Sequence, residues 1–186
     1  MNQLPKNAAL ILVDIQKGFE DDYWGKRNNI HAETNMELIL QTWRKTNRPV
    51  IHVQHISHKE NHPLRKESSG SEFKDFAIPL PDEPVFQKNV NSAFIGTNLE
   101  TYLREHNYET AVIIGLTTDY CVSTSVRMAG NLGFSTYVIS DATATFGRIS
   151  YDGNYYHAED IHKLALVSLH EMFATVLTTD KLLKLV

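Results

Sequence analysis

Short apolar runs alternate along the chain with stretches in which apolar residues recur every three or four positions. This alternation is typical of βαβ units, in which helices join parallel strands. Ala8 to Val13 is apolar throughout, as expected of a strand covered on both faces. Six runs fit strands in this way, at residues 8–13, 50–53, 84–87, 110–115, 135–139 and 174–177. The pattern therefore predicts a six-stranded, mainly parallel sheet.

Helical periodicity occupies the intervals between these runs. Met36, Ile39, Leu40 and Trp43 form an i, i+3, i+4, i+7 stripe, in a helix that should end near Asn47. Similar stripes predict helices around residues 97–106, 121–132 and 161–168. We therefore expect an α/β chain with a three-layer, Rossmann-like fold, helices on both faces of the sheet and one domain over residues 1–186.

Several residues are candidates for helix ends. Thr97 and Glu100 have the spacing of a capping box, and Gly133 is a candidate C-cap. Thr179 is a candidate cap for a terminal helical turn. Two polar segments, at 55–84 and 141–156, are longer than simple connectors. Long segments without a pattern inside compact domains are usually functional or lid-like.

Composition and charge narrow the class of protein. The chain of 186 residues is 42% hydrophobic and 22% charged, which is ordinary globular material. Its formal net charge of −4 gives no support for a nucleic-acid or anionic-membrane surface. No apolar stretch approaches the roughly 20 residues of a membrane span, and acidic residues interrupt the N-terminal apolar runs, unlike in a signal peptide. One cysteine cannot form an internal disulfide. We expect a soluble cytoplasmic protein with no membrane or nucleic-acid partner.

Three reactive side chains fall at the carboxyl ends of predicted strands, where parallel α/β sheets carry their sites. Asp14 follows the first strand, Lys88 the third, and Cys121 lies shortly after the fourth. Cys121 would open a helix, a position that favours the thiolate. Taken singly, these residues also fit a turn cap, a solvated charge and a small buried hydrophobe. Their shared edge of the sheet favours a catalytic site.

The segments around these residues resemble the isochorismatase-like cysteine hydrolases, which include nicotinamidases, N-carbamoyl amidohydrolases and ureidoacrylate amidohydrolases. The resemblance covers nearly the whole chain, in the family's order and spacing. The matching segments are Val13-Asp14-Ile15-Gln16-x-x-Phe19, Lys88 before Ser92-Ala93-Phe94, and Gly115-Leu116-Thr117-Thr118-Asp119-Tyr120-Cys121-Val122.

The resemblance implies a mechanism. Cys121 would be the nucleophile, Asp14 the general base and Lys88 the third member of a triad. The thiolate would attack an amide carbonyl, Asp14 would give a proton to the leaving amine, and water would hydrolyse the thioester. The backbone N–H groups of Thr117 and Cys121 would form the oxyanion hole, next to a cis peptide between Leu116 and Thr117. The implied substrate is a small amide, lactam or carbamoyl compound, and no cofactor is implied.

Aromatic residues are candidates for the substrate pocket. Phe19 lies five residues beyond Asp14, where the family commonly places an aromatic wall, although plain core packing also fits it. Tyr120 and Phe94 are further candidates for substrate binding. Asp119 fits a helix N-cap better than a chemical role. Trp24, Tyr151, Tyr155 and Tyr156 lie in loops near the same edge.

Four histidines, His52, His55, His58 and His62, raise the question of a metal. Nicotinamidases carry an Asp-x-His pattern after this strand and bind a metal there, but no Asp-x-His occurs in this segment. The run could still bind zinc. Histidines facing solvent or substrate are the favoured interpretation, so we predict no metal and disfavour nicotinamide as the substrate.

Two other functions are compatible with the pattern. An isochorismatase proper cleaves a vinyl ether by acid catalysis and does not need the thiol. A non-catalytic binding module of Rossmann type is disfavoured as a nucleotide binder, because no Gly-x-Gly-x-x-Gly follows the first strand. The family resemblance also implies a homodimer or homotetramer, with the aromatic segment Phe146 to Tyr156 as a candidate contact surface. The physiological substrate stays open.

Overall fold

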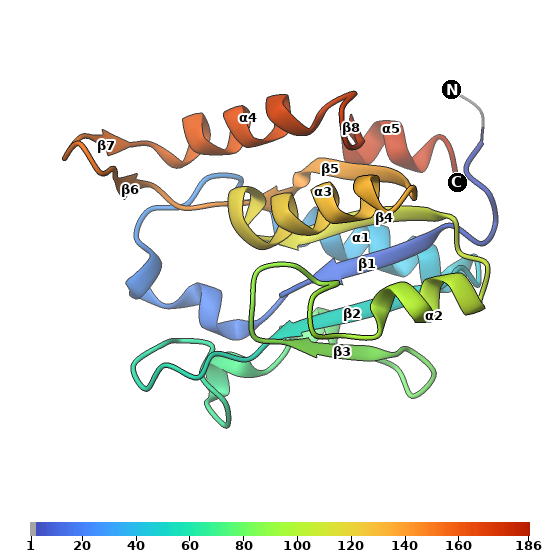
Figure 1. The fold of residues 1–186 in the computed structure, drawn as a ribbon, viewed down its shortest axis with the longest axis horizontal. Helices are drawn as coiled ribbons and strands as arrows, with labels where there is room; N and C mark the ends of the chain where they lie inside the picture. The colour runs from blue at the N-terminus through green and yellow to red at the C-terminus, as the bar shows by residue number, and fades with distance from the viewer. Residues whose placement is uncertain (1–2) are drawn as a thin grey trace.

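The computed structural model describes residues 3–186 and contains a six-stranded sheet in the order β3-β2-β1-β4-β5-β8 (Figure 1). Every neighbouring pair of strands in this sheet is parallel. The sheet predicted from the apolar runs is therefore confirmed. Its strands are β1 (Ala9–Val13), β2 (Val50–His55), β3 (Val85–Lys88), β4 (Thr110–Leu116), β5 (Ser135–Ala144) and β8 (Thr175–Leu177).

Helices cover both faces of the sheet, which confirms the three-layer α/β fold. Side chains of α1 and α5 join one apolar core, and side chains of α2, α3 and α4 join the other (Figure 1). The stripe predicted around Trp43 faces the sheet, and the indole Nε1 donates a hydrogen bond to Ala8 O at 2.9 Å. The helices are α1 (Ala32–Lys45), α2 (Leu99–Glu105), α3 (Ser123–Asn131), α4 (Ala158–Leu169) and α5 (Thr179–Leu183).

Shorter elements gather in the two polar segments and around the carboxyl ends of the strands. A hairpin of β6 and β7 extends beyond the sheet next to the start of α4 (Figure 1). The segment between β2 and β3 turns back so that Phe73 pairs with Gln16, directly beyond β1. The short elements are η1 (Lys17–Glu20), η2 (Asp22–Trp24), η3 (Ser69–Ser71), η4 (Asp75–Ala77), the π-helical turn η5 (Thr118–Val122), β6 (Arg148–Ile149) and β7 (Tyr155–Tyr156).

Strand β5 is longer than its apolar run predicts. It continues from Ile139 to Ala144 because the register with β4 shifts after Ile113, so that Thr143 and Ala144 pair with Gly115 and Leu116. Gly115 has φ 127°, and a Cβ atom there would collide with the carbonyl oxygen of Val13. The end of β4 can therefore approach β1 closely only without a side chain at this position.

The extension of β5 was not predicted because it contains the polar residue Asp141. The contact between Asp141 and Thr179 also corrects the prediction that Thr179 caps the terminal helix. The carboxylate of Asp141 accepts hydrogen bonds from the N–H and the hydroxyl of Thr179, both at 2.8 Å. Thr179 is therefore not the cap of α5. Thr178 holds that position, and its hydroxyl accepts a hydrogen bond from the N–H of Lys181 at 3.4 Å.

The capping box predicted at the start of α2 is not formed. The hydroxyl of Thr97 donates to Ala93 O at 2.6 Å, and Glu100 pairs with Arg104 one turn further along the helix. Gly133 does follow the end of α3 with φ 87°, as a residue after a helix often does. Within residues 3–186, no helix has both the length and the apolar character required to cross a membrane.

Candidate active site

Asp14, Lys88 and Cys121 lie at one edge of the sheet because each follows or ends a parallel strand. Asp14 comes directly after β1, and Lys88 is the last residue of β3. Cys121 lies in η5, shortly after β4 and before α3 begins at Ser123. The carboxyl ends of these strands point to the same side of the molecule (Figure 1). The structure therefore brings together the three residues that the sequence singled out.

The Lys88 ammonium lies between the other two groups. Its Nζ donates to Asp14 Oδ2 at 2.6 Å and to Cys121 Sγ at 3.3 Å. The side chains of Lys88 and Asp14 are both fully buried. Among residues 3–186, no group forms a hydrogen bond with the second carboxylate oxygen, Asp14 Oδ1. A carboxylate with one oxygen held by an ammonium and the other free can take up a proton from a neighbouring group.

Burial dominates the acid–base properties of the site. It raises the pKa of the Asp14 carboxyl, although the charge of Lys88 acts in the opposite direction. Burial also raises the pKa of the Cys121 thiol, and the charge of Asp14 raises it further. Burial alone would lower the pKa of Lys88, but the charges of Asp14 and Cys121 raise it overall. At neutral pH the site therefore holds a charged lysine and a protonated thiol beside a potential base.

This result differs from the thiolate expected at a helix start. Cys121 is only 8% exposed, and it lies within the π-helical turn rather than in the first turn of α3. The loss of hydration in this buried position, together with the nearby carboxylate, outweighs the attraction of Lys88 for the thiolate. Deprotonation of Cys121 therefore requires a proton acceptor close by.

The backbone after β4 presents two candidate donors for an oxyanion. The Leu116–Thr117 peptide bond is cis. Within the described part of the chain, the N–H groups of Thr117 and Cys121 donate to no carbonyl of another element, whereas Tyr120 and Val122 both donate to Thr117 O. The two N–H groups assigned to the oxyanion hole by resemblance therefore remain candidates for binding a ligand oxygen.

A small cavity of about 260 Å³ opens beside the thiol. Phe19 and Tyr120, two of the three predicted substrate-binding residues, lie in its walls. Trp24 also lines the cavity, and it packs on Phe19 with 4.9 Å between ring centroids. The cavity is lined by Phe19, Trp24, His55, Lys59, His62, Leu64, Asn91, Thr117, Tyr120 and Cys121.

Phe94, the third predicted substrate-binding residue, lies elsewhere. It is 9% exposed and belongs to the core beneath α2 and α3, where its ring stacks on Phe134 at 6.2 Å. The sequence reasoning missed Lys59, Leu64 and Asn91, because they lie in segments without an apolar period. Lys59 and Leu64 reach the cavity only because the 55–84 segment turns back toward the end of β1.

The histidines of the run divide between different surroundings. His52 is fully buried at some distance from the cavity, where its Nε2 lies 2.8 Å from Glu83 Oε2. His58 contacts Asn89. His55 and His62 line the cavity, with 6.2 Å between their ring centroids. The run therefore does not converge on one centre.

One potential cluster of metal ligands overlaps with the triad. A carboxylate oxygen of Asp14, a ring nitrogen of His55 and Cys121 Sγ lie within 4.8 Å of one another. However, Lys88 Nζ is within 3.3 Å of an atom of each of these residues. A metal ion bound there would have to displace a buried ammonium, so the residues present fit a lysine better than a metal.

Asp119 does not cap a helix. Its carboxylate accepts a hydrogen bond from Arg148 Nη2 at 2.6 Å and a short one from the Thr145 hydroxyl. The guanidinium of Arg148 lies over the ring of Tyr120, 4.3 Å from its centroid. The prediction that Asp119 is an N-cap is therefore wrong. Asp119 instead ties η5 to the segment after β5 and holds Arg148 against a wall of the cavity.

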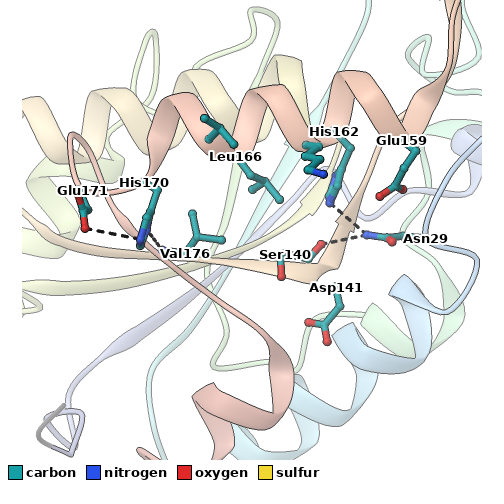
Figure 2. A pocket seen from close by; sticks show the side chains of 11 residues that line it. Asn29, Ser140, Asp141, Glu159, His162, Leu166, His170, Glu171 and Val176 are labelled. Atoms are coloured by element: carbon teal, nitrogen blue, oxygen red, sulfur yellow. Dashed lines mark hydrogen bonds and ion pairs between the residues drawn. The ribbon is translucent and has the colours of Figure 1, made fainter.

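A larger cavity of about 720 Å³ lies between α4 and the strands β5 and β8 (Figure 2). It contains no residue of the triad. His162, in its wall, has Nδ1 2.8 Å from the Thr118 hydroxyl and Nε2 3.3 Å from Asn29 Nδ2. The candidate active site is therefore the smaller cavity, beside the reactive groups, and not the larger one.

Comparison with known proteins identifies the family. The sequence model of the isochorismatase domain matches residues 8–181. The isochorismatase family protein YrdC of Bacillus subtilis is 48% identical over 97% of this chain and 96% of its own length. The chain belongs to the isochorismatase family. A crystal structure of an isochorismatase family member from Chromobacterium violaceum is 35% identical, with a TM-score of 0.94, over 100% of this chain and 96% of that one.

Two more distant relatives of this chain carry the names of specific enzymes. Nicotinamidase 3 of Arabidopsis thaliana is 29% identical over 95% of this chain and 87% of its own length. The N-carbamoylsarcosine amidase of Thermoplasma acidophilum is 25% identical, with a TM-score of 0.72, over 94% of this chain and 97% of that one. This protein is thus an isochorismatase-family hydrolase.

Proposed function

We propose that this protein is a cysteine hydrolase that cleaves a C–N bond in a small amide, lactam or carbamoyl compound through a thioester on Cys121. The observation that carries the proposal is the buried Lys88 ammonium, which contacts both Asp14 and Cys121 Sγ. In this arrangement the proposed nucleophile, Cys121, and the proposed base, Asp14, contact the same cation. Nicotinamidase 3 and the N-carbamoylsarcosine amidase, both named for C–N substrates, support this choice of bond.

The first half of the reaction forms the thioester. Asp14 takes the proton of the Cys121 thiol while Sγ attacks the carbonyl carbon. The carbonyl oxygen becomes an oxyanion that accepts hydrogen bonds from the N–H groups of Thr117 and Cys121. When the C–N bond breaks, the protonated Asp14 gives its proton to the leaving nitrogen. Ammonia or an amine departs, or, for a lactam, the ring opens and the freed amine stays attached to the acyl group, which remains on sulfur.

The second half regenerates the enzyme. A water molecule attacks the thioester carbonyl and gives one proton to Asp14. When the C–S bond breaks, this proton returns to sulfur, and the carboxylic or carbamic acid leaves. Protons and bonds therefore balance over the cycle without a cofactor.

Lys88 lowers the free-energy cost of proton transfer between Asp14 and Cys121. Both negative states, carboxylate with thiol and carboxylic acid with thiolate, keep their charge next to the same ammonium. The movement of charge from oxygen to sulfur therefore does not strand an unpaired anion in a buried site. This property matches a mechanism in which the thiolate exists only during attack.

The cavity limits the size of the substrate. At about 260 Å³ it lies below the usual range for drug-sized ligands, so a small molecule fits it best. Phe19, Trp24 and Tyr120 provide flat apolar walls, and Lys59 adds a cation. The proposed substrates are therefore compact, with an apolar or planar part beside the scissile carbonyl.

The test is mass spectrometry of the intact protein after mixing with a panel of small primary amides, lactams and N-carbamoyl compounds. We expect release of ammonia or an amine, or ring opening of a lactam, together with a transient acyl adduct on Cys121, all absent from Cys121→Ala. Turnover by Cys121→Ala at the wild-type rate would exclude the covalent mechanism. Activity toward a vinyl ether without any adduct would favour the alternative isochorismatase reaction, and ligand binding without turnover would favour a binding module.

A further inference from the structure

The Lys88 ammonium has a third contact that the triad does not use. Its Nζ lies 3.2 Å from His55 Nδ1, in addition to its hydrogen bonds with Asp14 and Cys121. An ammonium carries three N–H donors, and each buried donor requires an acceptor. Asp14, Cys121 and His55 together supply the three acceptors. The ammonium is therefore fully satisfied only when His55 is present.

The position of His55 is set by the sheet and by Gln16. His55 and Lys88 are register partners on the parallel strands β2 and β3. The buried Gln16 side chain accepts a hydrogen bond from the His55 N–H at 2.9 Å and donates to its carbonyl at 3.0 Å. The same amide group donates to Ser71 O at 2.8 Å. Both backbone polar groups of His55 are thus held by Gln16, and this fixes the point on the backbone from which the imidazole projects.

The contact also determines the form of the imidazole. A charged lysine can only donate, so Nδ1 of His55 must offer a lone pair and the ring proton must lie on Nε2. Burial and the neighbouring Lys88 charge lower the pKa of His55 to about 4. The ring is therefore neutral near pH 7 and can act as a permanent acceptor.

We propose that His55 is a positioning residue for this hydrolase. It accepts the third N–H of Lys88 and thereby aims the other two at Asp14 and Cys121. The proposal rests on the proposed function, because it concerns the same lysine and thiol. It adds a fourth residue to the site and assigns His55 to the reaction machinery rather than to a metal.

The experiment compares His55→Leu with His55→Asn, two side chains of similar size. Asn offers an oxygen near the position of Nδ1, whereas Leu offers no acceptor. The readout is the rate of alkylation of Cys121 by iodoacetamide at neutral pH, followed by intact mass. Because Cys121 is the only cysteine, each adduct reports on it alone. The assay needs no substrate, so its result does not depend on which bond the enzyme hydrolyses.

We expect His55→Leu to slow alkylation by about tenfold or more, the range for loss of a hydrogen bond to a charged group. His55→Asn should stay within about threefold of the wild type, since its acceptor is retained. His58→Leu is the matched control. His58 belongs to the same histidine run but contacts Asn89 and lies outside the cavity, so its rate should not change.

Equal alkylation rates in His55→Leu and the wild type would overturn the proposal. So would an equal loss in His55→Leu and His55→Asn, which would indicate packing rather than an acceptor. If thermal unfolding shows that His55→Leu does not fold, the Asn variant decides alone, and a tenfold loss there contradicts the proposal. Once a substrate is found, His55→Leu should lower kcat with little change in KM, while failure to find one would count against the proposed function only.

Discussion

At the scale of single residues, the Lys88 ammonium contacts two acidic groups, the Asp14 carboxyl and the Cys121 thiol, and either of them can carry a negative charge. Lys88 is 2.6 Å from an oxygen of Asp14 and 3.3 Å from the sulfur of Cys121, and the side chains of Lys88 and Asp14 are fully buried. A raised pKa on both acids means that neither gives up a proton readily to water. Loss of the Cys121 proton therefore depends on an acceptor close to the thiol, and Asp14 is the candidate.

The role of Asp14 can be separated from a structural role by a near-isosteric change. Asp14→Asn keeps the shape and one acceptor oxygen but cannot accept and return a proton. We expect kcat to fall by about 10²–10⁴-fold, the usual contribution of general acid–base catalysis. The measurement is steady-state hydrolysis of the amide that forms the adduct on Cys121. Retention of more than about half of kcat, far above that range, would contradict the general-base role.

Prolonged dialysis against a strong chelator should leave the activity unchanged. Lys88 occupies the centre of the only metal-like cluster among residues 3–186, formed by Asp14, His55 and Cys121, so an ion there would compete with an ammonium. The measurement is hydrolysis before and after dialysis, with zinc, iron or manganese added back. Activity that is lost and then restored by one of these ions would show that the site holds a metal.

At the scale of elements, the turn after β4 sets the orientation of Cys121. Cys121 lies in one π-helical turn, η5, before α3 continues as a regular helix. Such turns are rare and occur often at functional sites. Here η5 is anchored on both flanks, because Asp119 binds Arg148 and Thr118 binds His162. These anchors hold the turn against two segments that follow it in the chain.

A second polar cluster links elements at the opposite end of the sheet and predicts a pH dependence of stability. Burial raises the pKa of Glu83, but hydrogen bonds from Arg44, the Leu80 N–H and His52 outweigh it and lower the pKa from 4.5 to about 2. A carboxyl with a depressed pKa stabilises the fold above its unfolded pKa and loses that contribution as the pH falls. The free energy of unfolding should therefore decrease between about pH 4.5 and 2.

Urea unfolding at a series of pH values measures this contribution. Glu83→Gln should be less stable than the wild type at pH 7 and should show a weaker decrease below pH 4.5, because it lacks the titrating carboxylate. Glu100→Gln is the matched control, since Glu100 forms only an exposed pair with Arg104. An identical pH profile for Glu83→Gln and the wild type would contradict the assignment.

At the scale of the whole molecule, the reactive edge of the sheet is covered by segments that lie far apart in sequence. The turns η1 and η2, the 55–84 segment and η5 all contribute walls to the cavity beside Cys121. The β6–β7 hairpin extends past this edge (Figure 1). A two-stranded hairpin alone is marginally stable in water, so a further contact would stabilise it.

We predict that the chain forms a homodimer or homotetramer in which this hairpin takes part. Ile149 is 72% exposed and Tyr151 fully exposed, so the hairpin presents apolar surface that a second chain could cover. Sedimentation velocity should detect a species heavier than one chain, and Ile149→Asp should shift it toward the monomer. Met172→Asp is the control, since Met172 is 76% exposed outside the hairpin. A single monomeric species in the wild type would contradict the prediction.

Local patterns in the sequence were sufficient for the order of strands and helices and for the candidate triad. Apolar runs such as 110–115 and the stripe around Trp43 report directly on burial, because each residue's surroundings follow from the period of its own element. Asp14, Lys88 and Cys121 could be grouped because parallel strands share one carboxyl edge. These inferences need only the local periodicity of each element and the fact that parallel strands end at the same edge of a sheet.

The tertiary structure alone decided which side chains meet at that edge and which protonation states they hold. The pairing of His55 with Lys88 depends on the register between β2 and β3, and the burial that keeps Cys121 protonated depends on walls from several distant segments. Phe94 entered the core for the same reason, although its position in sequence resembles that of a pocket residue. Register and exclusion of water arise from contacts between elements, and no single stretch of sequence contains them.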